Sequence, residues 1–308
     1  MKKKILIIVN PCAGKGKVSK YIPEVCDNLE KTGNEIEVIY TSSRENGETI
    51  IKNYKKYINL VIVCGGDGTL SEVINGMIKT NKKVDVTFIP FGTTNDYAKT
   101  VNIPINKYKL SKDLDNYEEM RVDIGDFNKK YFYYVAAFGL FTSVSYTTKQ
   151  ELKNKFGRLA YFAKALEEIK KIKNYRVSIL ADNEIIKDKF IYGSVTNSTS
   201  IAGFRWFKDN EISVNDGKFE VVLIKKPRNI KDGLSIIKAI LTQKYNQKNV
   251  ISFKATNLKF DFEEEVSWTL DGEFGEKTKE TIILNKKNKI DLMLPGQSVE
   301  KMQKGIAK

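Results

Sequence analysis

The chain has 308 residues and a formal net charge of +14, and 41% of its residues are hydrophobic. These values describe a globular protein long enough for two domains, and they argue against disorder. The sequence contains no histidine, which excludes serine–histidine and cysteine–histidine nucleophile pairs, histidine-bound zinc and imidazole general bases. Any acid–base chemistry must therefore use carboxylates, lysine or tyrosine.

The cysteines and the net charge indicate the cellular compartment in which the protein acts. Cys12, Cys26 and Cys64 lack the spacing of a metal site and are typical of reduced thiols in a cytoplasmic protein. The apolar run at residues 5–9 is too short for a signal peptide, and no later run is long enough for a membrane span. The positive charge favours an anionic membrane surface or a phosphate ligand over nucleic acid, because no arginine-rich tract with interleaved aromatic residues is present. We expect a cytoplasmic protein with peripheral contact to the inner face of the membrane.

The first part of the chain alternates buried strands with helices. Strands are expected at residues 5–9, 35–41, 60–64 and 84–90, and helices at 18–31, 47–57 and 70–80. This alternation predicts an α/β domain with a parallel sheet covered on both faces. Ligands of such sheets bind beyond the carboxyl ends of the strands, and the loops after the first, third and fourth strands carry Gly with Asn, Asp or Thr.

From about residue 121 the patterns become mostly strand-like and are separated by Asn, Gly and Asp turns. Two helical stretches interrupt them, at residues 159–171 and 230–241, and the polar tail after Pro295 is expected to be helical and to pack on the first domain. The expected fold class is therefore α/β plus β. The predicted domains are residues 1–122 with the tail 296–308, and a β-sandwich-like domain of residues 123–295, with the active site in the cleft between them.

The stretch "VCGGDGTL" places a carboxylate inside a glycine-rich loop that follows a buried strand. Gly66 and Gly68 allow backbone N–H groups to approach an anion, and the helix that follows adds its dipole. A carboxylate at Asp67 would repel a phosphate unless a divalent cation lies between the two. The sequence therefore favours a magnesium nucleotide over a bare phosphate, the alternative being a tight connection with no ligand.

The loop after the first strand, "NPCAGKGK", matches neither of two familiar phosphate motifs. Gly14 and Gly16 lack the third glycine of a dinucleotide fingerprint, and Val18 stands where a P-loop needs Ser or Thr. Taken alone, the loop is equally consistent with a phosphate contact and with a flexible basic loop.

Six motifs occur in one order along the chain: "NPxxGKG", "GGDGT", "PFGTTND", "RVDIGDF", "NDGKFEV" and "TLDGE". Together they resemble the lipid kinase family that includes bacterial diacylglycerol kinases, sphingosine kinases and ceramide kinases. They span residues 10–273, and although "GGDGT" is shared with NAD kinases and phosphofructokinases, the ordered set is specific. The resemblance implies a NAD-kinase-like first domain, ATP and Mg²⁺ as cofactors, and a lipid hydroxyl as the phosphoryl acceptor.

The resemblance also implies roles for individual residues. The positions expected to contact the nucleotide are Asn10, Pro11, Cys12, Ala13, Gly14, Lys15, Thr41, Gly66, Asp67, Gly68, Thr69, Leu70, Ser71, Glu72 and Thr93. The carboxylates of Asp67, Asp96 and Asp123 match positions that organise the catalytic magnesium through water, and Glu273 matches the proton acceptor. A second, structural magnesium is expected at Ser213, Asp216 and Lys218.

Two residues depart from the family pattern. Lys99 stands where the family usually has Arg, which replaces a bidentate fork with a point charge. Asn215 replaces the first Asp of the usual Asp-Asp-Gly and lowers the negative charge at the structural metal turn.

Several of these segments have simpler interpretations. Asp216-Gly217 and Asp271-Gly272 are typical hairpin dipeptides, and Asp123 is also compatible with a solvent-facing strand position. The stretch "YFYYVAAF" is interpreted as core rather than as a lipid groove. The basic amphipathic residues 156–173 lie either on a membrane or, as the favoured interpretation, over the β-rich domain.

We therefore predict an ATP-dependent kinase of a membrane lipid, with diacylglycerol as the first candidate. Phosphatidylglycerol or a sphingoid base as the acceptor, a NAD kinase, and a degenerate nucleotide-binding regulator are the alternatives. The expected partner is an anionic membrane surface and not nucleic acid, and strand edges of the β-rich domain allow a homodimer.

Overall fold

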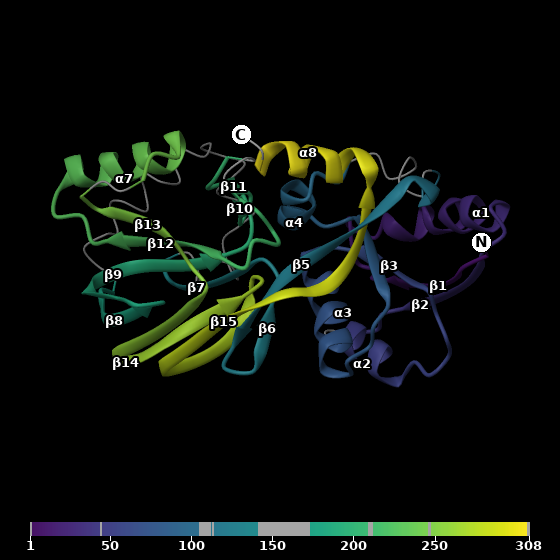
Figure 1. Cartoon of the computed structure of the whole chain (residues 1–308), viewed down its shortest axis with the longest axis horizontal. Coiled ribbons are helices and arrows are strands. Elements are labelled where there is room, and N and C mark those ends of the chain that lie inside the picture. Colours follow the sequence, from purple (N-terminus) through teal and green to yellow (C-terminus); the bar gives the residue numbers. More distant parts are fainter. Residues whose placement is uncertain are drawn as a thin grey trace. The chain divides into compact units, whose positions relative to one another are not determined.

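The computed structural model describes residues 2–43, 45–104, 112, 114–140, 173–208, 212–245 and 248–306. The chain divides into two compact units (Figure 1). Unit 1 comprises residues 1–124, 198–216 and 286–308, and unit 2 comprises residues 125–197 and 217–285. The sequence-based boundaries placed residues 198–216 and 286–295 in the second domain, and the structure places both segments in unit 1.

Unit 1 is built on a parallel sheet in the order β4–β3–β1–β2. Its strands are β1 (Lys4–Val9), β2 (Glu35–Tyr40), β3 (Leu60–Gly65) and β4 (Asp85–Pro90). β3 is buried along its whole length, because helices cover both faces of a parallel sheet and leave no polar side.

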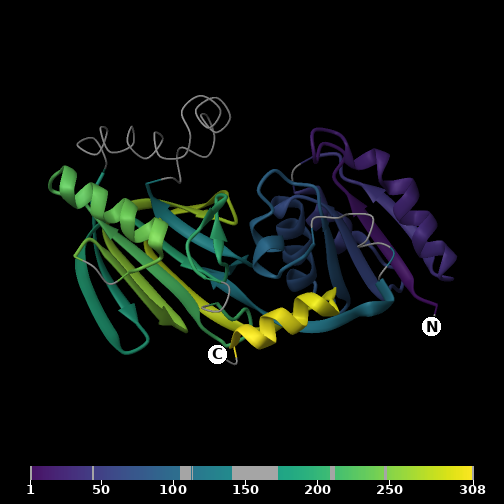
Figure 2. The same cartoon turned by 90° about the horizontal axis from the view of Figure 1, so that it is seen from above.

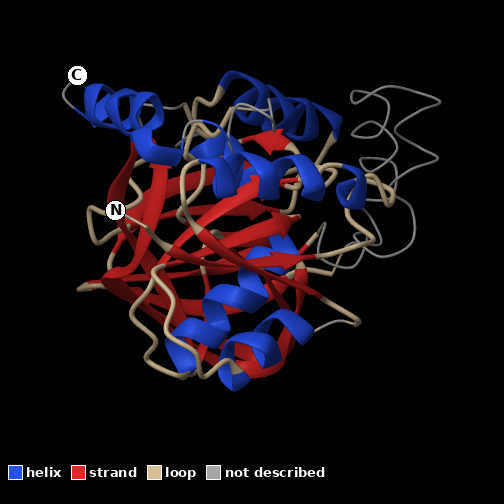
Figure 3. Cartoon of the chain, turned by 90° about the vertical axis from the view of Figure 1, so that its right-hand side faces the viewer, coloured by secondary structure: helices blue, strands red, loops and turns tan. Residues whose placement is uncertain are grey.

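In the described part of unit 1, five α-helices accompany this sheet. They are α1 (Ile22–Lys31), α2 (Asn46–Asn53), α3 (Asp67–Lys79), α4 (Asp96–Thr100) and α8 (Gly296–Ile306). Figures 1 and 3 show α2 and α3 on one face of the sheet and α1, α4 and α8 on the other. The sheet and the helix pattern confirm the predicted α/β class of this part of the chain.

The structure corrects two of the predicted helices and adds one that was not predicted. The helix expected at residues 18–31 is split into a 3-10 turn at Val18–Lys20 and α1, because a proline lies in the first turn of α1. α3 begins at Asp67 and not at Leu70, so the carboxylate of the glycine-rich loop lies in the first turn of a helix. The short helix α4 was not predicted.

The two reassigned segments are attached to unit 1 by backbone pairing and side-chain contacts. Residues 198–216 contain the hairpin of β10 (Ser200–Ile201) and β11 (Phe204–Arg205), whose loop residues bind side chains of α4, as described below. In the last strand, β15 (Glu273–Pro295), Leu292 pairs in parallel with Val86 of β4. The expectation that the tail packs on the first domain is confirmed, since the Ser298 Oγ donates a hydrogen bond of 2.7 Å to the Asn102 carbonyl.

Unit 2 is β-rich, as predicted. Its strands are the end of β5 (Tyr117–Phe127), β6 (Lys130–Phe132), β7 (Val135–Gly139), β8 (Tyr175–Ala181), β9 (Glu184–Thr196), β12 (Phe219–Lys225), β13 (Val250–Ala255), β14 (Asn257–Leu270) and the first part of β15. Antiparallel pairing joins them in the order β13–β12–β9–β7–β14–β15, and β8 pairs with both β9 and β14. The described strands thus form one connected sheet and not the two separate sheets expected of a sandwich.

Aromatic rings fill the core of unit 2. Trp268 packs edge-on against Phe127 and Phe260, with ring centroids 5.2 and 5.1 Å apart, and lies 4.9 Å from the ring of Phe138. Such edge and tilted contacts are favourable for aromatic pairs. The interpretation of "YFYYVAAF" as core is confirmed, because Phe132 and Phe138 are fully buried.

One long helix, α7 (Ile230–Thr242), follows β12, and the Asn229 side chain caps it by accepting a hydrogen bond from the Asp232 N–H. The helix expected at residues 159–171 and the membrane or covering role considered for residues 156–173 fall almost wholly outside the described residues. No helix in the described part of the chain is long and apolar enough to cross a membrane.

A buried carboxylate fixes the turn before β15. Asp271 is 4% exposed, and its two oxygens accept hydrogen bonds from the backbone N–H groups of Tyr133, Tyr134 and Val135 at 3.0, 3.0 and 3.1 Å. Asp271 and Gly272 have φ angles of 50° and 87°, so the interpretation of this dipeptide as a hairpin turn is confirmed. The turn is therefore held from the side by three charge-assisted hydrogen bonds.

We expect Asp271→Ala to lower the free energy of unfolding by about 3–5 kcal/mol, because it leaves three buried N–H groups without acceptors. Asp182→Ala is the matched control. Its exposed carboxylate accepts backbone hydrogen bonds from Thr256 and Asn257, and water can replace it. Urea unfolding checks the comparison, and equal losses for the two variants would contradict it.

Candidate active site

Three loops meet at the carboxyl ends of β1, β3 and β4 in unit 1. The Asn10 N–H donates to the Cys64 carbonyl at 3.0 Å, and the Asn10 Nδ2 donates to the Thr69 Oγ1 at 3.0 Å. The Phe91 N–H donates to the Gly65 carbonyl at 2.6 Å. These bonds join the loop "NPCAGKGK" to "GGDGT", and "GGDGT" to "PFGTTND".

Glycine is required where two of these loops touch. A Cβ on Gly92 would lie 2.8 Å from the Gly66 Cα and 2.7 Å from the Asn95 Oδ1, distances that real Cβ atoms do not adopt. Gly68 differs, since a Cβ there would meet nothing within 4 Å. The loops are thus packed backbone to backbone at Gly66 and Gly92, while Gly68 faces open space.

The N-terminus of α3 is available to an anion. Gly66 is its N-cap, and no side chain caps the first turn. Because the first N–H groups of a helix have no intrahelical acceptor and carry partial positive charge, this end of α3 suits a phosphate. The open space beside Gly68 lies at the same turn.

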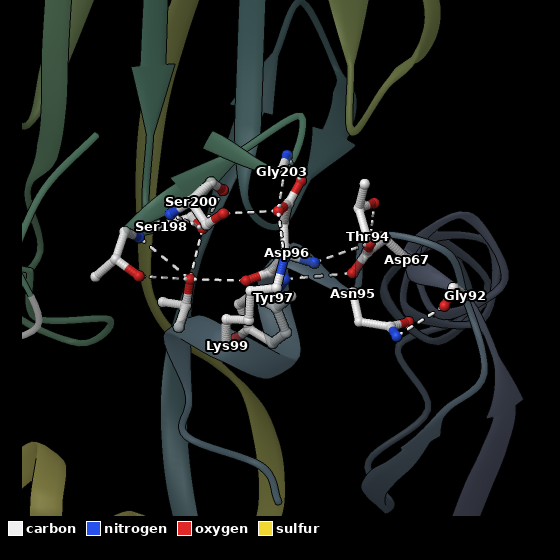
Figure 4. Close-up of polar contacts among 12 residues, drawn as sticks. Asp67, Gly92, Thr94, Asn95, Asp96, Tyr97, Lys99, Ser198, Ser200 and Gly203 are labelled. Carbon is white, nitrogen blue, oxygen red and sulfur yellow. Dashed lines mark hydrogen bonds and ion pairs between the residues drawn. The ribbon is translucent and has the colours of Figure 1, made fainter. Parts of the chain in front are cut away.

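Asp67 is the first residue of this helix, and its carboxylate lies beside Thr94, Asp96 and Tyr97 and is only 8% exposed (Figure 4). Its Oδ2 accepts from the Asp96 N–H at 3.1 Å, and its Oδ1 accepts from the Tyr97 N–H at 3.2 Å. Burial, and secondarily the Asp96 charge, raise the pKa of Asp67 to about 6, although the two N–H bonds lower it. The protein therefore holds an acidic group whose charge is only partly compensated.

Asp96 is more deeply buried, at 1% exposure, and has donors of its own. The Ser200 Oγ donates to its Oδ1 at 2.7 Å, and the Gly203 N–H lies 3.1 and 3.0 Å from the two oxygens. Lys99, at the position where the family usually has Arg, approaches only to 3.5 Å and has a half-exposed side chain. Ser200 and Gly203 thus make the closer contacts to Asp96.

Sequence reasoning missed the segment around Ser200. The Thr100 Oγ1 lies 2.6 Å from the Ser198 Oγ, and the Ser198 Oγ donates to the Ser200 carbonyl at 2.8 Å (Figure 4). The signal available in the sequence was the run "NSTS" after a buried strand, with Gly203 three residues beyond it. In the structure, Ala202 and Gly203 have φ angles of 54° and 80°. A run of small hydroxyl residues that ends in a left-handed turn is suited to binding a buried carboxylate.

Asp123 is fully buried in β5, so the solvent-facing interpretation is wrong. Its backbone N–H donates to the Val214 carbonyl at 2.8 Å, and its Oδ1 accepts from the Asn288 N–H at 2.8 Å. Within the described ranges, no group of three or more Cys, Asp or Glu side chains is arranged to hold a metal ion. Asp67 and Asp96 therefore form a close pair, and the three aspartates do not form a direct metal-binding triad.

The predicted nucleotide positions differ in accessibility. Cys12, Lys15 and Thr93 are exposed, and Asn10, Pro11, Gly14 and Ser71 are half-buried. Ala13, Thr41 and Leu70 are buried, and Leu70 is at 0% exposure, so a ligand could reach only its backbone. The half-buried Glu72 accepts from the Glu45 and Gly47 N–H groups at 3.0 and 2.9 Å and so binds the start of α2.

Two predicted positions lie on turns. In the expected structural metal turn, Gly217 has a φ of 81°, and the Ser213 Oγ donates to the Asn215 Oδ1 at 3.0 Å. The amide that replaces the family's Asp is thus bound to Ser213. Glu273 is exposed and is the first residue of β15, directly after the Asp271-Gly272 turn.

Comparisons with known proteins agree with this architecture. Residues 4–127 match the sequence profile of the diacylglycerol kinase catalytic domain. The diacylglycerol kinase of Staphylococcus carnosus (strain TM300) is 30% identical over 298 residues, which cover 96% of each chain. The diacylglycerol kinase of Bacillus subtilis (strain 168) is 28% identical over 303 residues, which cover 97% of this chain and 99% of that one.

A crystal structure of a diacylglycerol kinase from Bacillus anthracis str. Sterne has the same fold. It superposes with a TM-score of 0.73 at 20% identity and covers 95% of this chain and 97% of that one. Profile and relatives together define a transferase of the kinase class. The chain belongs to the diacylglycerol kinase family, as the six ordered motifs predicted.

Two glycine variants separate loop packing from ligand space. We expect Gly92→Ala to lower the free energy of unfolding by about 1–3 kcal/mol, because its Cβ would overlap Gly66. Gly68→Ala should leave stability unchanged or raise it by up to about 1 kcal/mol, as alanine favours a helix, and should weaken ATP binding. Thermal unfolding and titration with ATP check both variants. Unchanged ATP affinity in Gly68→Ala would show that this space does not receive the nucleotide.

Proposed function

We propose that this protein is an ATP-dependent lipid kinase that transfers the γ-phosphoryl group to the hydroxyl of diacylglycerol and yields phosphatidic acid. The observation that carries the proposal is the buried carboxylate of Asp67 inside an uncapped helix N-terminus, next to a second buried carboxylate, Asp96. Membership of the diacylglycerol kinase family supports the choice of acceptor.

The residues present fit a magnesium ion that enters with ATP. Each oxygen of Asp67 accepts a backbone N–H, and the Thr94 hydroxyl lies 3.4 Å from its Oδ2. Carboxylate oxygens are the ligands that a hard, hydrated cation such as magnesium prefers. A positive charge close to Asp67 and Asp96 would offset the burial and, secondarily, the Asp96 repulsion that raise the pKa of Asp67. When bound, magnesium would neutralise negative charge on the transferred phosphoryl group.

The chain's own groups would bind and orient the phosphates. The first N–H groups of α3, at Gly68 and Thr69, offer donors without competing side-chain acceptors. Asn10 fixes the Thr69 hydroxyl, and the exposed Lys15 supplies a positive charge in the neighbouring loop. Phosphoryl transfer depends mainly on such positioning and charge stabilisation.

The acceptor alcohol must lose a proton as it attacks, and its pKa lies far above neutrality. A carboxylate near the attacking oxygen can accept that proton, and the chain has no histidine to do so. We assign this role to Glu273, which is exposed at the start of β15 and whose turn is fixed by the buried Asp271. Asp123 would support the magnesium network through water.

Two further assignments belong to the same proposal. A second magnesium would bind the Asp216 side chain with the carbonyls of Ser213 and Lys218, and the bonded amide of Asn215 adds no charge there. The net charge of +14 suits peripheral attachment to the anionic inner face of the membrane. Another lipid acceptor, such as phosphatidylglycerol or a sphingoid base, and NAD are the alternatives.

A transfer assay from labelled ATP, offering diacylglycerol and NAD in parallel, tests the function. We expect label only in phosphatidic acid, and we expect Glu273→Gln to lower the turnover number at least about a hundredfold while the unfolding temperature is unchanged. Glu276→Gln, on the same strand, is the control with normal turnover. Label in NAD would reject the lipid assignment, and normal turnover in Glu273→Gln would reject only the role of Glu273.

A further inference from the structure

One side of α7 exposes large apolar side chains to solvent. Leu234 is 57% exposed and Leu241 is 59% exposed, and the half-buried Ile237 lies between them. Residues at spacings of three, four and seven lie on the same side of a helix, so these three form one stripe. Scattered single apolar residues need no explanation, whereas a continuous stripe on a helix does.

The opposite side of α7 already packs on unit 2. Ile236, Ala239 and Ile240 are 8%, 0% and 4% exposed, and Figures 1 and 2 show the helix lying over the β9–β12–β13 end of the sheet. The Asn229 cap and the packed side hold the helix in place. The stripe is therefore not needed for docking of the helix on its own unit.

Lysines lie beside the stripe and at its end. Lys231 and Lys238 lie along one edge, Lys244 follows the left-handed C-cap residue Gln243 just beyond the helix, and all three are exposed. Among the described residues, no carboxylate forms an ion pair with these three lysines. The helix contains a single acidic residue, Asp232, which is 9% exposed and is bonded to the Arg228 N–H and paired with Lys248.

We propose that the α7 face, defined as Lys231, Leu234, Ile237, Lys238, Leu241 and Lys244, binds the surface of an anionic lipid bilayer. An apolar stripe bordered by lysines, without acidic residues, is complementary to the negative headgroups and the acyl boundary of such a surface. The inference rests on the proposed lipid kinase function, and it names the surface by which unit 2 reaches its substrate. Electrostatic attraction brings the lysines to the headgroups, and the leucines insert below them.

Another exposed apolar pair shows what the α7 face adds. Leu180 and Ile185 lie opposite each other on β8 and β9 and are 42% and 65% exposed. On the same surface, the basic residues Arg176 and Lys259 are bound to Glu263 and Glu280 in ion pairs. The exposed Lys187 and Lys189 also lie here, and the exposed carboxylates of Asp261, Glu263 and Glu280 lie among the basic residues. This surface of mixed charge is therefore a control that should bind anionic lipid more weakly than the α7 face.

Sedimentation with vesicles of phosphatidylglycerol or phosphatidylcholine tests the proposal on the full chain. Lys231→Gln with Lys238→Gln should weaken binding to the anionic vesicles by about fivefold for each lysine at low salt. Leu234→Ala with Leu241→Ala should remove the binding that persists at high salt. Leu180→Ala with Ile185→Ala should bind like the parent.

Insertion can be observed directly with Leu241→Trp. The native tryptophans, Trp206 and Trp268, are 4% and 0% exposed, so the new indole should account for the change when vesicles are added. We expect a blue shift of its emission and quenching by brominated lipids. Absence of quenching, or vesicle binding unchanged in both double variants, would overturn the proposal. So would dissociation of a dimer by these variants without any effect on vesicle binding, which would assign the face to a second copy of the chain.

The phosphorylation of a water-soluble short-chain diacylglycerol separates this inference from the proposed function. The α7 variants should phosphorylate it at the parent's rate, because no bilayer is involved. If the parent fails to phosphorylate it while the α7 variants lose vesicle binding, the proposed function fails and the lipid surface stands. If the parent is active and the variants still bind vesicles normally, only the inference about α7 fails.

Discussion

The site in unit 1 depends on the burial of one carboxylate beside another. Asp67 and Asp96 are 8% and 1% exposed, and the backbone N–H of Asp96 binds the side chain of Asp67. Burying like charges raises the pKa of Asp67 to about 6, which is unfavourable for an ionised group at neutral pH. A bound cation would neutralise the two buried carboxylates and so explain why the protein places them together. Ionisable groups with strongly shifted pKa values are often found at functional sites.

Other features of unit 1 serve to hold that pair. Gly66 and Gly92 let two loops pack without side chains between them, and the turn at Ala202 and Gly203 directs an N–H group at Asp96. The Ser200 hydroxyl adds a second donor at 2.7 Å. The family's usual Arg can therefore be replaced by Lys99 without leaving Asp96 unsupported.

Part of this account was accessible from sequence. Periodicity and turn residues predicted the parallel sheet, the three glycine-containing loops at its carboxyl edge and the β-rich second part, because these depend on local patterns of burial. The start of α3 at Asp67 was missed, since the glycines of Gly-Asp-Gly disfavour a helix and the sequence pattern therefore predicts a loop. The contact between residues 198–203 and Asp96 could not be predicted, because it joins segments about a hundred positions apart through hydrogen bonds that leave no periodic signal. For the same reason the assignment of residues 198–216 to unit 1 required coordinates.

The central claim is that Asp67 takes part in nucleotide binding through a divalent cation. Isothermal titration of ATP into the parent protein and into Asp67→Asn, with magnesium or with a chelator, tests this claim most directly. The parent should bind ATP at least about tenfold more tightly with magnesium, a difference of ~1.4 kcal/mol, and Asp67→Asn should lose most of that difference. Equal affinities of the parent for ATP with and without magnesium would contradict the account.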